Sequence, residues 1–167
     1  WHGGIDIIGL DSDKIRMPYY NGKKITGTVT RARIVTNRAD KTWEWGWYVC
    51  VRLDTNQTPD AVNYLYFCHC ASLLVRVGQR VASGDALAVM GQTGNAAGGY
   101  KHCHFEARST ATGTGVDPTA YAGIDNSVGV YGTVDDGKTE QISETPTGKT
   151  MQCLMIGPLA PQGMNKC

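Results

Sequence analysis

The sequence predicts an all-β fold with a core built largely from antiparallel strands. Its apolar segments are short, rich in β-branched and aromatic residues, and separated by clusters of Gly, Asn, Asp and Pro. The chain also contains 21 glycines, which suits many tight turns. No segment shows the long apolar periodicity of an amphipathic helix. These observations favour one all-β domain over residues 1–123.

Five stretches are predicted to contain the strands, because each combines β-branched or aromatic residues with flanking turn residues. In chain order they read KITGTVTRARIVT, WGWYVCVRLD, NYLYFCHCASLLV, RVASGDALAVMGQTG and HCHFEARST. If the second strand extends towards its N-terminal side, Trp43, Trp45 and Trp47 alternate onto one face. Such a row would grip glycan or peptide, and ordinary core packing is the open alternative.

The C-terminal part has a different composition. Residues 124–149 are polar and rich in Gly and Thr, which predicts a linker or a loose hairpin. Residues 150–167 hold a short apolar run followed by Gly-Pro, and we expect a tail that starts a second, truncated domain. The chain opens at Trp1 inside a motif, so we expect a piece of a longer protein whose N-terminal part is missing.

Charge and hydropathy exclude several classes of partner. The chain has 16 basic and 15 acidic residues and no run of Lys or Arg, so binding to nucleic acid or anionic lipid is not predicted. Its longest apolar runs are far too short for a membrane span, and no signal-peptide pattern opens it.

Six cysteines are too few for a disulfide scaffold. Strand alternation places the thiols of Cys50, Cys68, Cys70 and Cys103 on faces opposite their polar neighbours, which favours buried free thiols over bridges. Whether Cys153 and Cys167 pair stays open.

The four histidines carry the chemistry. His102 and His104 are two residues apart on a predicted strand, so both rings face the same space. In HGGID, His2 and Asp6 are separated by three residues, two of them glycines that let the backbone bend closely. The two motifs together can supply the three protein ligands of a catalytic zinc, which keeps its fourth position for water. Imidazole and carboxylate suit zinc, whereas thiols that face away disfavour a structural Cys site. For an isolated H-x-H, two unrelated histidines are an equally open interpretation.

Four motifs in this order resemble the lysostaphin- or LytM-type zinc metallopeptidases, which cut peptidoglycan peptide bridges. They are HGGID, then YFCHCASLLVRVGQRVASGDALAVMGQTGNAAGG, then HCHFEAR, and finally GVDPTAY, and together they cover residues 1–121. The resemblance implies a sandwich-like antiparallel sheet with loops around a zinc cleft. It also implies one zinc ion per chain.

The resemblance assigns roles residue by residue. His2, Asp6 and His104 match the family's zinc ligands, while His69 and His102 match two cleft histidines that do not bind the metal. Imidazole has a reference pKa of about 6.5, which suits a catalytic group that moves a proton near neutral pH.

Glu106 shares the strand face of His104. We expect it to orient a histidine or a loop rather than to act as the base, because metal-bound imidazoles usually donate their other N–H to a carboxylate or carbonyl. A solvated carboxylate is the alternative. GNAAGG replaces the family's Ser/Thr-Gly-Pro segment, and Tyr100 and Lys101 are additions before His102. These departures concern substrate preference more than the metal site.

The resulting hypothesis is a zinc-dependent endopeptidase that hydrolyses peptide bonds in bacterial peptidoglycan, in the stem peptide or the cross-bridge. A catalytically silent binding or regulatory module is one alternative. Another is the lysin part of a phage tail assembly, with other domains or subunits as partners. The expected location is extracellular, at the cell wall or on a virion.

Overall fold

The computed structural model describes residues 1–9, 12–122, 127–129 and 131–132. Its strands are β1 (Ile5–Ile7), β2 (Lys14–Arg16), β3 (Thr26–Ile34), β4 (Trp47–Leu53), β5 (Tyr64–Leu73), β6 (Arg80–Ala82), β7 (Ala86–Met90), β8 (Cys103–Arg108), β9 (Gly115–Val116) and β10 (Ser127–Gly129). Two 3₁₀ helices, η1 (Lys41–Trp45) and η2 (Gly94–Ala96), and a four-residue helix, α1 (Thr119–Ala122), complete the described part. The predicted all-β class is confirmed.

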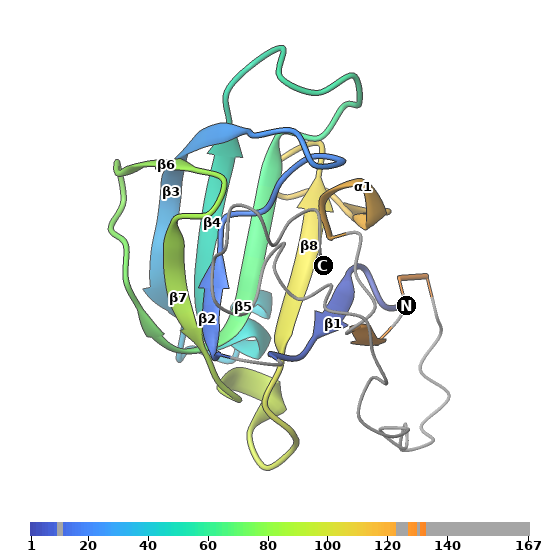
Figure 1. Ribbon diagram of the computed structural model, residues 1–167. Helices are drawn as coiled ribbons and strands as arrows, with labels where there is room; N and C mark the ends of the chain where they lie inside the picture. The colour runs from blue at the N-terminus through green and yellow to red at the C-terminus, as the bar shows by residue number, and fades with distance from the viewer. Residues whose placement is uncertain (10–11, 123–126, 130, 133–167) are drawn as a thin grey trace.

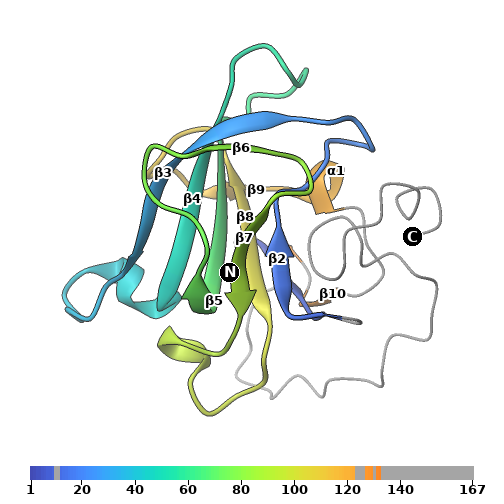
Figure 2. The same ribbon diagram turned by 60° about the vertical axis from the view of Figure 1, so that its left-hand side comes forward.

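The long strands lie side by side in the order β10-β1-β8-β5-β4-β3-β6 (Figure 1), and every strand pairing is antiparallel. β7 pairs with the end of β5 and with β2, so the sheet turns back over itself. Figure 2 shows β2 and β7 as a second layer over one face of the long strands. The result is sandwich-like, as the sequence indicates.

The main core lies between these two layers. Ile15 of β2 and Leu87 of β7 join Phe67 of β5 and Phe105 of β8 in one buried cluster. Burial of this apolar surface is the main force that holds the layers together, at roughly 25 cal/mol per Å². Because side chains alternate along a strand, the neighbours of Phe105 point to the opposite face. That opposite face carries the candidate site.

The buried thiols divide between the two faces. Cys50, Cys68, Cys70 and Cys103 are all free and buried, which confirms the prediction. Cys70 and Cys103 lie in the main core, but Cys50 and Cys68 pack in a small cluster on the other face with Tyr48 and Tyr66. The expectation that every thiol faces away from the polar residues is therefore wrong for Cys68, which pairs with His104 in the β5–β8 register.

The cause is a bulge at His69. This residue has a φ of 64°, and the register of β5 against both β4 and β7 shifts around it. An extra residue in one strand reverses the alternation beyond it. Cys68 and Cys70 are consequently on opposite faces, although they are two residues apart.

The predicted tryptophan row is also wrong. Trp43 and Trp45 belong to η1, not to a strand, because Asp40 caps this helix through Thr42 N–H and Gly46 ends it with a φ of 62°. The ring of Trp45 packs against Tyr48 and Tyr66, with centroids 5.1 Å away in each case.

Part of the predicted linker 124–149 belongs to the sheet. Ser127–Gly129 forms β10, which pairs antiparallel with β1. The rest of that segment beyond residue 132, together with the predicted tail 150–167 and its two cysteines, lies outside the described residues. Among the helices that are described, none has the length and apolar character to cross a membrane.

Candidate metal centre and active site

Three side chains from two neighbouring strands and the N-terminal segment converge on one point. The Nε2 atom of His2 is 3.2 Å from Asp6 Oδ1 and 3.1 Å from His104 Nδ1. Asp6 Oδ1 and His104 Nδ1 are 2.8 Å apart. Among the described residues, this is the group of His, Cys, Asp and Glu side chains that is arranged to hold a metal ion.

Backbone pairing sets this convergence. Asp6 of β1 lies opposite His104 of β8, so the two side chains share one face at the same level. His2 reaches the same point because the chain before β1 follows β8 closely. At Gly4, a Cβ atom would overlap the backbone carbonyl of Phe105, which explains why glycine is needed there.

The donor set fits zinc. Two imidazole nitrogens and one carboxylate oxygen are ligands that zinc favours, and three protein ligands are typical of a catalytic site. Donors about 2.0–2.1 Å from one tetrahedral ion lie roughly 3.3 Å from each other, slightly more than the separations seen here. A small outward movement of the three side chains would therefore accommodate the ion.

His104 is held from both sides by carboxylates. Its Nε2 is 2.9 Å from Glu106 Oε1, opposite the Nδ1 atom that faces Asp6. Burial disfavours the imidazolium, but hydrogen bonds to Asp6 and Glu106 outweigh it and raise the pKa of His104 to about 9. The expected role of Glu106 in orienting a histidine agrees with this contact, which leaves Nδ1 directed at the metal centre.

Asp6 stays ionised. Although burial opposes its charge, hydrogen bonds with His104 and His2 hold the pKa of Asp6 well below its usual range. Its second oxygen, Oδ2, accepts a long hydrogen bond of 3.4 Å from the Tyr100 hydroxyl. Oδ1 is thus the atom that faces the metal centre.

His69 lies beside this group because of its bulge, which turns its side chain onto the site face. Its Nδ1 is 2.8 Å from the carbonyl oxygen of Thr93, and its ring centroid is 4.8 Å from that of His102. Burial and the neighbouring His102 and His104 lower the pKa of His69 to about 4. His69 is neutral at pH 7.

His102 occupies the other side of the cleft. Its Nδ1 is 3.0 Å from the carbonyl oxygen of Tyr100, and the Tyr100 ring packs on it with a centroid distance of 4.5 Å. Its Nε2 is 3.8 Å from Asp6 Oδ1. His102 therefore lies next to the candidate ligands without belonging to the converging group, which agrees with the division of roles that the resemblance implies.

The tautomers of the two cleft histidines follow from their partners. A backbone carbonyl can only accept a hydrogen bond, so Nδ1 carries the proton in neutral His69 and neutral His102. Nε2 of each ring then has a lone pair that can accept a proton.

These side chains line a hollow of about 300 Å³. Its rim includes Glu44 and Trp45 of η1 and Asn95 of η2, which the sequence interpretation did not single out for the site. The two 3₁₀ helices approach so closely that a Cβ atom on either Gly46 or Gly94 would overlap the other loop. The order GNAAGG, noted as a departure from the family, is the available sequence signal for this rim.

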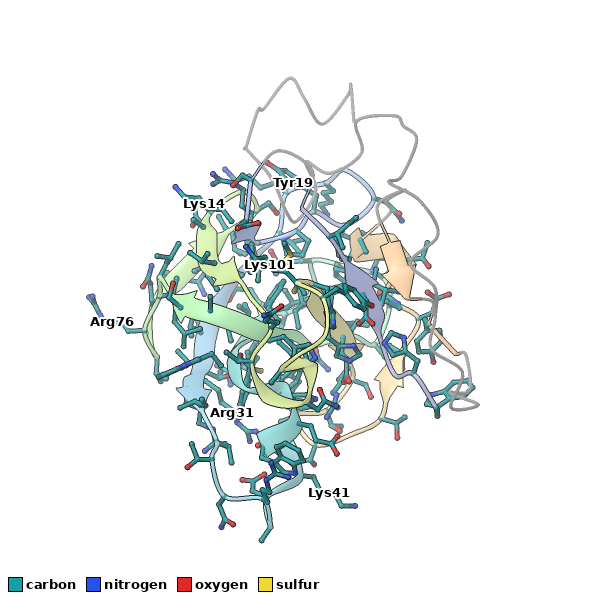
Figure 3. All side chains as sticks on the ribbon, turned by 90° about the horizontal axis from the view of Figure 1, so that it is seen from below. Lys14, Tyr19, Arg31, Lys41, Arg76 and Lys101 are labelled. Atoms are coloured by element: carbon teal, nitrogen blue, oxygen red, sulfur yellow. The ribbon has the colours of Figure 1, made fainter. Side chains whose placement is uncertain are left out.

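A second hollow of about 470 Å³ adjoins the first. The two share five lining residues, which are Trp1, Gly3, Glu44, Trp45 and Glu106. Arg31 and Lys41 line its outer part, and Figure 3 shows Lys41 extending into solvent. The cleft is therefore long enough to continue well beyond the metal centre.

Comparison with known proteins agrees with this architecture. The catalytic domain of the antimicrobial peptidase lysostaphin from Staphylococcus simulans is similar, with 20% identity, a TM-score of 0.52, and coverage of 71% of this chain and 76% of that one. The prophage-encoded M23 protein EnpA from Enterococcus faecalis gives 19% identity, a TM-score of 0.51, and coverage of 71% and 76%. LytU gives 25% identity, a TM-score of 0.50, and coverage of 71% and 70%.

No curated protein matches this sequence significantly. The family model "Peptidase family M23", in contrast, matches residues 2–118, which is more than half of the chain and includes all five predicted site residues. The resemblance to lysostaphin- and LytM-type peptidases is thereby confirmed at the level of the family. The chain belongs to peptidase family M23.

Proposed function

We propose that this protein is a zinc-dependent endopeptidase that hydrolyses peptide bonds in bacterial peptidoglycan. The observation that carries the proposal is the convergence of His2 Nε2, Asp6 Oδ1 and His104 Nδ1 within 3.2 Å of one another, beside two further histidines in a cleft. Membership of a peptidase family and the similarity in fold to lysostaphin support the substrate class.

The metal and the chain would divide the chemistry. Zinc held by His2, Asp6 and His104 would polarise the scissile carbonyl and lower the pKa of a water molecule to about 7. His69 and His102 would do the remaining work, because Nε2 of each neutral ring can take a proton from the attacking water. Once protonated, the same atom becomes a donor. It can then stabilise the negative oxygen of the substrate or pass the proton to the leaving amine as the C–N bond breaks.

The silent-module alternative is less well supported. A binding module has no need for ligands or proton carriers, yet all five positions are filled here and lie around one hollow. A place in a phage tail lysin is compatible with the same chemistry and would supply further domains or subunits as partners. Because the proposed substrate is the cell wall, we propose that the protein acts outside the cytoplasmic membrane.

Digestion of purified peptidoglycan tests the proposal. Walls from several species with different cross-bridges are incubated with zinc-loaded protein, and the released peptides are identified by mass spectrometry. We expect paired fragments with a new amine and a new carboxylate at one type of bond. The cleavage should stop with a chelator and return with added zinc. Binding to the walls without any release of peptides would instead favour the silent module.

A further inference from the structure

Behind His104 lies a chain of contacts that ends in the wall of the cleft. Glu106 divides its two oxygens between two partners. Oε1 faces His104 Nε2 at 2.9 Å, and Oε2 accepts a hydrogen bond from Arg108 Nε at 2.5 Å. Both side chains of the Glu106–Arg108 ion pair are largely buried, with 7% and 14% of their surfaces exposed.

Two aromatic rings hold Arg108 in turn. The guanidinium carbon is 5.0 Å from the ring centroid of Trp45 and 5.0 Å from that of Tyr66. Arginine stacked in this way is attracted to both ring faces, and its planar fork is fixed in orientation. Trp45 belongs to η1 and lines the cleft, while Tyr66 belongs to β5.

The alternation of β8 explains why these groups can act together. His104, Glu106 and Arg108 occupy every second position of the strand, so their side chains follow each other along one face. The other face carries Cys103, Phe105 and Ala107, which are fixed in the main core. The strand is therefore a rigid base for the row.

We propose that Arg108 is a positioning residue for the metal centre. By holding Glu106 ionised and in place, it keeps the His104 ring oriented with Nε2–H towards Glu106 and Nδ1 towards the metal. Without Arg108, a buried carboxylate would lose its strongest ion-pair partner and favour its protonated form. A protonated Glu106 would compete as a donor, and His104 would lose its fixed orientation. This inference rests on the proposed zinc site.

The test measures zinc affinity by competition with a chromophoric chelator. We expect Arg108→Met to weaken zinc binding by about tenfold, at the lower end of the 10–100-fold effect of outer-shell partners. Arg80→Met is the matched control, because Arg80 forms an ion pair with Asp54 and does not line the cleft. It should leave the affinity unchanged. Arg108→Lys keeps the charge but lacks the planar fork, so it should recover part of the loss and is used if Arg108→Met does not fold.

A double-mutant cycle separates positioning from general destabilisation. If Arg108 acts through Glu106, then Arg108→Met introduced into a Glu106→Gln background should change zinc affinity by about twofold or less. An equal loss in both backgrounds would overturn the inference, as would a loss in Arg108→Met no larger than in Arg80→Met. Failure of the wild-type protein to bind zinc would instead contradict the proposed function itself.

Discussion

Asp6 and His104 face each other across β1 and β8, and Asp6 Oδ1 lies 2.8 Å from His104 Nδ1. One antiparallel register thus brings together two candidate metal ligands that are 98 residues apart in sequence. Since each residue also has an outer partner, Tyr100 for Asp6 and Glu106 for His104, the two donor atoms are fixed towards a common point.

The two cleft histidines are expected to serve catalysis and not metal binding. His69→Ala and His102→Ala should retain about one zinc per chain but lose roughly 10²–10⁴-fold in hydrolysis, the usual contribution of general acid–base groups. Zinc content is measured by elemental analysis, and hydrolysis by peptide release from peptidoglycan. His2→Ala serves as the contrasting variant, because it should lose zinc as well. Unchanged hydrolysis in both cleft variants would contradict these roles.

Zinc binding should release a proton at neutral pH. The pKa of His104 is raised to about 9, so the metal-free protein holds a proton on this ring at pH 7, and the ion must displace it from Nδ1. Affinity should therefore rise with pH, by up to about tenfold per pH unit, and level off above about pH 9. Titration calorimetry in buffers of different ionisation enthalpy gives the proton count. Zinc uptake at pH 7 without proton release would be inconsistent with this account.

His69 should stay neutral in mildly acidic solution. Its pKa is lowered to about 4 by burial and by the neighbouring His102 and His104. The unfolded chain takes up this proton near pH 6.5. The native state therefore binds fewer protons than the unfolded state between these values, and the contribution of His69 to stability falls as the pH drops through that window. Nitrogen NMR of the metal-free protein should show a midpoint near 4, whereas a midpoint near 6.5 would refute the prediction.

The close approach of the N-terminal segment to β8 should make Gly4 sensitive to substitution. In Gly4→Ala, the added methyl group would overlap the Phe105 carbonyl, and we expect a loss of about 1–3 kcal/mol in the free energy of unfolding. Gly3→Ala is the matched control, because its Cβ would lie 3.6 Å from Glu106 Oε1, an ordinary contact. Denaturant unfolding measures both variants. Equal stability of the two would show that the approach at Gly4 is not tight.

Much of the fold is predictable from local pattern. Each of the five predicted stretches contains at least one observed strand, because β-branched and aromatic residues bounded by turn residues reflect local requirements of a sheet. The site residues also stand out locally, since HGGID and HCH each place two polar donors within a few residues.

What escaped prediction depends on contacts between distant segments. The bulge at His69 arises where β5 meets both β4 and β7, and it decides that Cys68 faces the site. Trp45 alternates with its neighbours as a strand residue would, yet the cap at Asp40 and the turn at Gly46 place it in η1. These features follow from register and from turn geometry, which single-strand periodicity does not contain.

The central claim is that His2, Asp6 and His104 hold one zinc ion. Anomalous X-ray diffraction at the zinc absorption edge, from crystals of the zinc-loaded protein, tests it directly. We predict one anomalous peak per chain, within about 2.0–2.2 Å of His2 Nε2, Asp6 Oδ1 and His104 Nδ1. A peak bound to other side chains, or no peak at this site in protein loaded with zinc, would contradict the account.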